Sequence, residues 1–240
     1  MKDYTILRVN DHTDSYYTKK ADIFDLPFRV LCVGKSFLSG KSTVVLNLLL
    51  REKFFKNDFE GENIFIVSNN KLDNKIRILK TEKDVPDENF MKFSEGNLEA
   101  IYEEVEQRAL DRIQEGKRPM NSVVILDDVA FSGGLKEKLN GTLSRIFCQG
   151  RHINLSILVT AQKQTQLSTT MRSNASGAIL FSNSMNEVDA MAHDFNYTDS
   201  KKSFVSLFRK ATKAKNSFLV VNFSNDEIYQ DSEFKPISLE

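Results

Sequence analysis

The sequence has little of what marks several common classes of protein. Its two cysteines, Cys32 and Cys148, lie far apart, so the chain has no disulfide framework and no cysteine-rich zinc motif. The three histidines show no metal-ligand spacing with them. Only four prolines occur among 240 residues, and no proline-rich linker divides the chain. These absences favour one large domain or two small ones, with a core that needs no covalent or metal staple.

No charge of either sign predominates. Lysine and arginine number 33 together, as do aspartate and glutamate, so the formal net charge is zero. This balance excludes a histone-like protein that coats nucleic acid through bulk charge, although it is compatible with a local basic patch. No apolar run reaches the roughly 18 residues that span a membrane. The polar N-terminus also lacks the apolar segment of a signal peptide, so we expect a soluble protein of a reducing compartment.

Short apolar runs alternate with segments of helical periodicity. Runs typical of buried parallel strands cover residues 28–33, 63–68, 122–126, 155–160, 177–181 and 218–223, and weaker strand candidates cover 4–9 and 90–93. Helices are expected over residues 43–55, 97–115, 135–148, 185–195 and 203–211. This alternation predicts an α/β domain over residues 28–223, with a mainly parallel central sheet flanked by helices. An N-terminal extension (1–27) and a polar C-terminal tail (224–240) flank that domain.

The segment after the first predicted strand carries the strongest chemical signal. Its SGKST core, Ser39–Thr43, matches the end of the phosphate-binding loop G-x-x-x-x-G-K-[ST], which joins a strand to a helix. Gly40 lets the backbone approach the phosphates, and the following amides point at anionic oxygens. Lys41 is expected to pair with the β- and γ-phosphates, and Ser42 to hold Mg²⁺. The sequence therefore predicts a site for a nucleoside triphosphate.

The loop departs from the usual pattern upstream of this core. Counting back from Gly40, Lys35 occupies the position of the first glycine, and Gly34 lies one residue earlier. Either the loop starts at Gly34 and is one residue longer than usual, or it has the usual length and Lys35 replaces the glycine. In the second case Lys35 would supply another cation near the γ-phosphate; otherwise it is a solvent-exposed lysine.

Two acids follow the strand predicted over residues 122–126. In P-loop ATPases the first such acid coordinates Mg²⁺ and the second polarises the attacking water. Asp127 and Asp128 fit those roles in that order, with Asp127 acting on the ion through Ser42 or through water. The alternative is a strand end with solvated acids, which the phosphate loop upstream makes the weaker interpretation.

Three further side chains are candidates for the same chemistry. Gln162 closes the strand predicted over residues 155–160, and it would sense the γ-phosphate or orient the water if that strand lies between the other two. Otherwise it is an ordinary loop glutamine. Arg151 and Arg172 are candidates for a finger that reaches a neighbouring subunit, because a finger needs a planar, permanently charged guanidinium. Each is equally compatible with a surface ion pair.

Two other patterns carry less weight. Residues 70–73 read N-K-x-D, the guanine-reading pattern of GTPases, but they precede the acidic strand instead of following it late in the domain. This order favours ATP over GTP. A basic stretch over residues 201–215, interleaved with Phe204 and Phe208, would suit contacts with a phosphate backbone, or it forms an amphipathic helix with a solvated face.

The segments SGKST, VVILDD, FCQGRHINLSILVTAQ and TTMRSNA together resemble the genome-packaging ATPases of double-stranded DNA viruses, above all the poxvirus-type group of the FtsK/HerA superfamily. The likeness concentrates between residues 125 and 181. The resemblance implies a RecA-like P-loop NTPase domain that forms a ring, usually of five or six subunits. It implies that ATP hydrolysis at subunit interfaces, with Mg²⁺, drives duplex DNA into a preformed capsid. It also implies a trans-acting role for Arg151 and a sensor role for Gln162.

The same resemblance implies double-stranded DNA and a capsid or portal-vertex protein as partners. It implies a place in the host cytoplasm or virus factory, or in association with the virion. Three alternatives stay open. Other DNA-pumping ATPases of the superfamily usually carry membrane segments or DNA-reading domains, and a small-molecule kinase needs an arginine-rich lid. A non-hydrolysing scaffold usually loses the groups that Lys41, Ser42, Asp127 and Asp128 retain here.

Overall fold

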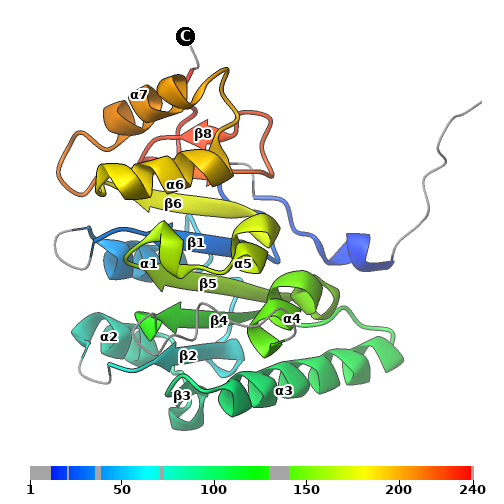
Figure 1. Ribbon diagram of the computed structural model, residues 1–240. Coiled ribbons are helices and arrows are strands. Elements are labelled where there is room, and N and C mark those ends of the chain that lie inside the picture. The colour runs from blue at the N-terminus through cyan, green and yellow to red at the C-terminus, as the bar shows by residue number, and fades with distance from the viewer. Residues whose placement is uncertain (1–11, 21, 36–38, 71–72, 130–140, 239–240) are drawn as a thin grey trace, which may run out of the picture.

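The computed structural model describes residues 12–20, 22–35, 39–70, 73–129 and 141–238. Its centre is an eight-stranded sheet in the order β3-β2-β4-β5-β1-β6-β7-β8 (Figure 1). The strands are β1 (Arg29–Val33), β2 (Ile64–Ser68), β3 (Phe90–Met91), β4 (Ser122–Asp127), β5 (Leu155–Ala161), β6 (Gly177–Phe181), β7 (Phe218–Asn222) and β8 (Tyr229–Gln230). Neighbours from β3 to β6 run parallel, whereas β7 is antiparallel to both β6 and β8.

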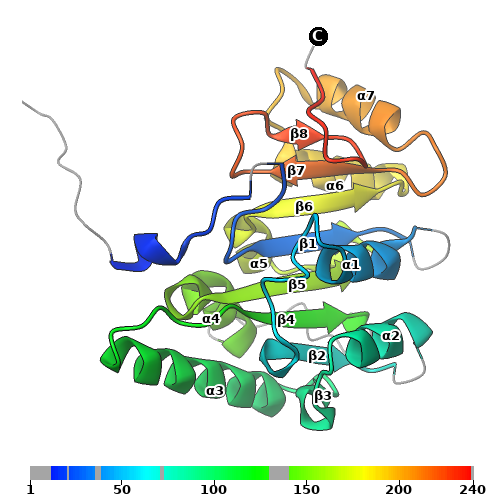
Figure 2. The ribbon, with the colours of Figure 1, turned by 180° about the vertical axis from the view of Figure 1, so that it is seen from behind.

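Helices cover both faces of this sheet. They are α1 (Lys41–Leu50), α2 (Asn74–Glu82), α3 (Glu95–Gln114), α4 (Thr142–Gln149), α5 (Thr169–Asn174), α6 (Met185–Phe195) and α7 (Lys201–Ala211). Helices α3 to α7 pack on one face, seen in Figure 1, and α1 and α2 on the other, seen in Figure 2. The strands are buried on both sides, which explains their continuous apolar runs. In the described part of the chain, no helix is a candidate for a membrane span, because none is both long and apolar.

These observations confirm the predicted α/β fold with a mainly parallel sheet. The predicted strand over residues 4–9 lies outside the described residues, as does most of the first half of the helix predicted over 135–148. Helix α1 stops at Leu50, earlier than expected, because Arg51 adopts an extended conformation with φ −100° and ψ 138°. Helices α2 and α5 are additional to those predicted. Both are short, so few apolar positions mark their period.

Five 3₁₀ helices connect the larger elements. They are η1 (His12–Tyr16), η2 (Gly61–Asn63), η3 (Asp87–Asn89), η6 (Gly150–Ile153) and η7 (Gln164–Gln166) among the described residues. Two of them, η6 and η7, stand at opposite ends of β5 and carry or adjoin the predicted site residues. Arg151, in η6, and Gln162, just before η7, therefore lie at opposite ends of β5.

The chain packs on the sheet beyond the limits expected for the domain. Strand β8 pairs with β7 through Val221 and Tyr229, and the rings of Tyr229 and Phe234 are buried. Residues 224–238, expected as a polar tail, thus form part of the packed structure. At the other end, Phe24 and Leu26 are buried in the core beneath α1.

The sheet order has one consequence for the predicted site. Strand β5 lies between β4 and β1, which is the arrangement that a sensor role for Gln162 requires. The carboxyl ends of β1, β4 and β5 therefore meet at one edge of the sheet. In open α/β sheets, ligands bind at this edge.

Candidate nucleotide site

The phosphate loop joins β1 to α1 at the carboxyl edge of the sheet. Gly40 adopts a left-handed conformation with φ 85° immediately before α1, which a glycine does without steric strain. Gly34 packs so closely that an added Cβ would lie 2.6 Å from the Cβ of Phe181. Only glycine fits there, whereas Lys35 is exposed. This packing favours the interpretation in which a longer loop begins at Gly34; residues 36–38 lie outside the described part.

The Lys41 side chain closes over this loop. Its Nζ donates hydrogen bonds to the carbonyl oxygens of Gly34 (2.6 Å) and Lys35 (3.1 Å) and to Oγ of Ser39 (3.3 Å). These three acceptors match the three donors of an ammonium group. Burial lowers the pKa of Lys41, and the nearby Cys32, Asp128 and Asp127 oppose that shift. The ammonium group is therefore held inside the loop by three acceptors of the loop itself.

The two acids lie at the end of β4, beside β5. Leu126 of β4 is in register with Val159 of β5, which brings Asp127 next to Thr160. The Thr160 hydroxyl donates to Asp127 Oδ1 at 2.9 Å and accepts from the backbone N–H of Asp128 at 3.0 Å. Burial raises the pKa of Asp127, against the effect of the Thr160 hydrogen bond. Thr160, which sequence reasoning missed, therefore sets the position of both acids.

Gln162 contacts the second acid directly. Its side-chain Nε2 donates to Asp128 Oδ1 at 3.1 Å, while its backbone carbonyl oxygen accepts from Asn183 Nδ2 at 2.9 Å. Asp128 has a left-handed backbone with φ 50°, a conformation that aspartate tolerates better than most residues. The Gln162–Asp128 hydrogen bond and the left-handed backbone of Asp128 together fix how the two side chains are oriented. The fold thus brings together the residues predicted as water-polarising acid and phosphate sensor.

The residues predicted as metal ligands suit Mg²⁺. This ion takes oxygen ligands and usually keeps several waters beside one or two carboxylates and the phosphates of its substrate. Ser42 lies in the first turn of α1, which follows β1, and Asp127 ends β4, so a hydroxyl and a carboxylate stand on either side of β5. Within the described ranges, no group of three or more His, Cys, Asp or Glu side chains forms a metal site by itself. An ion here would therefore depend on the phosphates of a bound nucleotide.

The N-K-x-D segment serves the fold in another way. The Asp73 carboxylate accepts from the backbone N–H groups of Lys75 (2.8 Å) and Ile76 (3.4 Å) and so caps α2. Lys75 then reaches the phosphate loop, where its Nζ donates to Thr43 Oγ1 at 2.8 Å. Lys75 also lines the cavity of about 230 Å³ over the loop, beside Lys41. It is a second cation at the site that the sequence pattern did not identify.

Arg151 lies at the opposite end of the sheet from the phosphate loop. It precedes β5, and the seven residues of that strand rise about 3.3 Å each, so about 20 Å separate its two ends. The Arg151 side chain is exposed, with Nε 3.5 Å from Nε2 of His152. It therefore does not reach the phosphate loop of its own chain.

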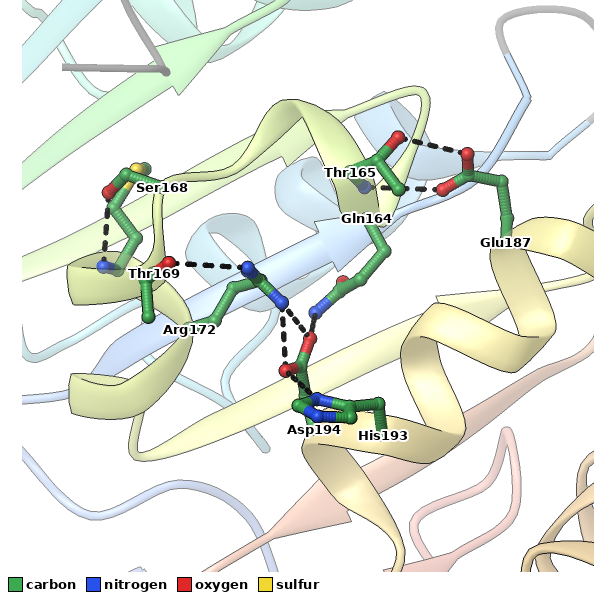
Figure 3. A network of polar contacts seen from close by, with 9 residues as sticks. Gln164, Thr165, Ser168, Thr169, Arg172, Glu187, His193 and Asp194 are labelled. Atoms are coloured by element: carbon green, nitrogen blue, oxygen red, sulfur yellow. Dashed lines mark hydrogen bonds and ion pairs between the residues drawn. The ribbon is translucent and has the colours of Figure 1, made fainter.

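Arg172 belongs to a separate polar network between α5 and α6 (Figure 3). Its Nη1 donates to both carboxylate oxygens of Asp194, at 2.8 and 2.7 Å, and Gln164 Nε2 donates to Asp194 at 2.8 Å. Partial burial would raise the pKa of Asp194, but the hydrogen bonds from Arg172, Gln164 and His193 lower it overall. The structure thus places Arg172 in an ion pair within its own chain.

The same network holds the segment that follows Gln162. Thr165 donates to the Glu187 carboxylate through its backbone N–H (3.2 Å) and its Oγ1 (3.0 Å), as Figure 3 shows. Gln166 Oε1 accepts from the backbone N–H groups of Gln162 and Lys163 at 3.1 and 3.0 Å. Glu187 of α6 therefore binds Thr165 of η7, and Gln166 of η7 binds the backbone of Gln162.

Comparison with known proteins decides the family. The sequence profile of the Poxvirus A32 protein family matches residues 16–235. The chain belongs to the poxvirus A32 family. This membership confirms the resemblance to poxvirus-type packaging ATPases, and with it the expectation of an ATPase. A search of curated protein sequences gave no significant match.

Solved structures share the fold at low sequence identity. The genome packaging NTPase B204 from Sulfolobus turreted icosahedral virus 2, in complex with sulfate, is 15% identical with a TM-score of 0.58, and the alignment covers 88% of this chain and 97% of that one. The complex of B204 with AMPPCP gives 15% identity and a TM-score of 0.55, covering 82% and 93%. EssC (ATPases 2 and 3) from Geobacillus thermodenitrificans gives 14% and 0.55, covering 81% of this chain and 37% of that one.

Proposed function

We propose that the protein is a motor that hydrolyses ATP to drive double-stranded viral DNA into a preformed capsid. The observation that carries this proposal is the meeting of Lys41, Asp127, Asp128 and Gln162 at one edge of the sheet. Membership of the A32 family supports the packaging part of the proposal. Double-stranded DNA and a capsid or portal-vertex protein are the proposed partners, and the host cytoplasm or virus factory the proposed place of action.

The catalytic roles follow from the contacts in the site. Lys41 exchanges its loop carbonyl partners for β- and γ-phosphate oxygens, and backbone amides of Ser39–Thr43 bind the remaining oxygens. Ser42 and Asp127 would hold Mg²⁺, which would neutralise charge on the phosphates. Asp128 accepts a hydrogen bond from the attacking water on the carboxylate oxygen that Gln162 does not use. The Gln162 amide sits between this acid and the phosphate and orients both.

The placement of Arg151 supports a ring with ATP sites between subunits. Its exposed guanidinium lies at the other end of β5, a strand about 20 Å long, from the phosphate loop of its own chain. Head-to-tail packing in a closed ring places different faces of one subunit against its two neighbours. Arg151 of one subunit then stabilises transition-state charge in the site of the next. Arg172, already paired with Asp194, is the weaker candidate for that role.

The first test is steady-state ATP hydrolysis by the purified protein, with and without long double-stranded DNA. The Lys41→Ala variant is the blank, because it lacks the ammonium group that binds the phosphates. We expect duplex DNA to stimulate hydrolysis by the wild type and to have no effect in the blank. Hydrolysis that is the same with and without DNA would contradict the DNA-driving part of the proposal. Absence of hydrolysis under both conditions would contradict the enzyme itself.

A further inference from the structure

A second cavity adjoins the phosphate loop. It has a volume of about 450 Å³, within the range of roughly 300–1,000 Å³ that is usual for small-molecule sites. One wall is the outer side of α1, including Val44 and Asn47. The other is the start of β7 together with residues 232–235 of the C-terminal segment. The three rings of Phe54, Phe218 and Phe234 line it.

This cavity borders the space over the loop. Gly40, Thr43 and Asn216 line both the 450 Å³ cavity and the 230 Å³ cavity that contains Lys41. A ligand whose phosphates reach Lys41 therefore has the larger cavity directly beside it. The cavity on the other side of the loop is lined by Lys35, Lys213 and Lys215, which suits an anion better than a heterocycle.

The three rings are less deeply buried than the other rings of their cluster. Phe54, Phe218 and Phe234 retain 6–7% exposure, whereas Phe24, Phe55 and Phe59 retain at most 1%. The Phe54 and Phe234 ring centroids lie 5.2 Å apart, and those of Phe218 and Phe234 lie 6.2 Å apart. Aromatic side chains that line a binding cavity stack on nucleobases with little dependence on which base it is.

A tight turn presents Phe234 to the cavity. Asp231 Oδ1 accepts from the backbone N–H groups of Glu233 (2.8 Å) and Lys235 (3.0 Å), and the Phe234 N–H donates to the Asp231 carbonyl at 3.0 Å. Phe234 itself has φ 63°, a left-handed conformation that is uncommon for a large side chain and persists where the surroundings fix it. The C-terminal segment is thus built to hold one ring at this place.

We propose that this cavity binds the base and ribose of the nucleoside triphosphate, with Phe54, Phe218 and Phe234 as the stacking surface. The inference rests on the proposed nucleotide site and extends it to a segment more than 180 residues away in sequence. It makes residues 232–235 part of the substrate site. The affinity for the nucleoside half of ATP then depends on Phe234, and the affinity for the triphosphate half depends on Lys41.

The experiment compares two ligands by isothermal titration calorimetry on the full chain with Mg²⁺: a non-hydrolysable ATP analogue and inorganic tripolyphosphate. Phe234→Leu keeps an apolar side chain and removes the stacking ring. We expect it to weaken binding of the analogue at least about fivefold and to leave tripolyphosphate binding unchanged. Phe24→Leu, in a ring that packs against Phe234 at 6.3 Å and does not line the cavity, is the matched control and should change neither.

A second variant protects the test against a folding defect. Asn47→Phe fills the cavity from α1 without removing a core side chain, and it should likewise weaken only the analogue. Equal weakening of both ligands by both variants, or unchanged analogue affinity in both, would overturn the proposal. A wild type that binds tripolyphosphate as tightly as the analogue would overturn the base site alone. A wild type that binds neither ligand would overturn the nucleotide site as well.

Discussion

The side-chain amide of Gln162 donates a hydrogen bond of 3.1 Å to the carboxylate of Asp128, across 34 residues of sequence. The contact joins the ends of β5 and β4, and Thr160 ties the same two ends together through Asp127 and the backbone N–H of Asp128. Because both acids and the amide are held by neighbouring strands, they form one structural unit at the proposed catalytic site.

This unit predicts how single substitutions divide binding from turnover. Asp128→Asn should bind Mg²⁺–ATP almost as the wild type does, while kcat falls by at least about 100-fold, the usual lower range for loss of a general base. Gln162→Ala should also lower kcat with little change in KM, because Gln162 orients the acid and the γ-phosphate, whereas Lys41 and the loop amides supply most of the binding to the substrate. Steady-state kinetics measure both quantities. The assignment is wrong if Asp128→Asn retains wild-type turnover.

Asp127 predicts a dependence of stability on pH. Its pKa is raised by burial above the 3.8 of an ordinary aspartate. Its contribution to folding is therefore fully present below pH 3.8 and is lost as the pH rises through the folded pKa. Asp127→Asn removes the ionisation and still accepts the Thr160 hydrogen bond.

Denaturant unfolding without nucleotide checks this expectation. Asp127→Asn should be more stable than the wild type at pH 7, and the difference should shrink as the pH falls toward 3.8. With Mg²⁺ and a non-hydrolysable ATP analogue the order should reverse, because the variant lacks a metal ligand. A wild type that is the more stable protein at pH 7 without nucleotide would contradict the account.

The Arg172–Asp194 pair predicts the opposite pH dependence. The hydrogen bonds on Asp194 lower its pKa despite partial burial, so its stabilising contribution is present above pH 3.8 and is lost as the pH falls through the folded pKa. Arg172→Ala should cost about 1–2 kcal/mol at pH 7, since Nη1 contacts both carboxylate oxygens but the pair is partly exposed. The cost should diminish in acid. Arg172→Ala with unchanged stability and lost turnover would instead assign Arg172 to catalysis.

The sequence predicted what local patterns encode. Continuous apolar runs marked the buried strands, and SGKST and the paired acids marked the loop and the end of β4. The sequence did not reveal the contacts made between distant segments. Nothing near Arg172 in the chain points to Asp194, and nothing near Phe234 points to α1. Thr160 is one polar residue in an apolar strand, and only the register of β4 and β5 shows what it does.

The most direct test of the central claim mixes two inactive proteins. Arg151→Ala should bind ATP normally and lose most of its turnover, since a finger arginine contributes about 10³–10⁵ in rate in known systems. Asp128→Asn keeps Arg151 and lacks the water-polarising acid. If ATP is hydrolysed between subunits, a one-to-one mixture forms competent sites at about a quarter of its interfaces by random assembly. DNA-stimulated hydrolysis should then reappear in the mixture. A mixture as inactive as its two components, under conditions where the subunits exchange, would contradict catalysis with Arg151 acting in trans.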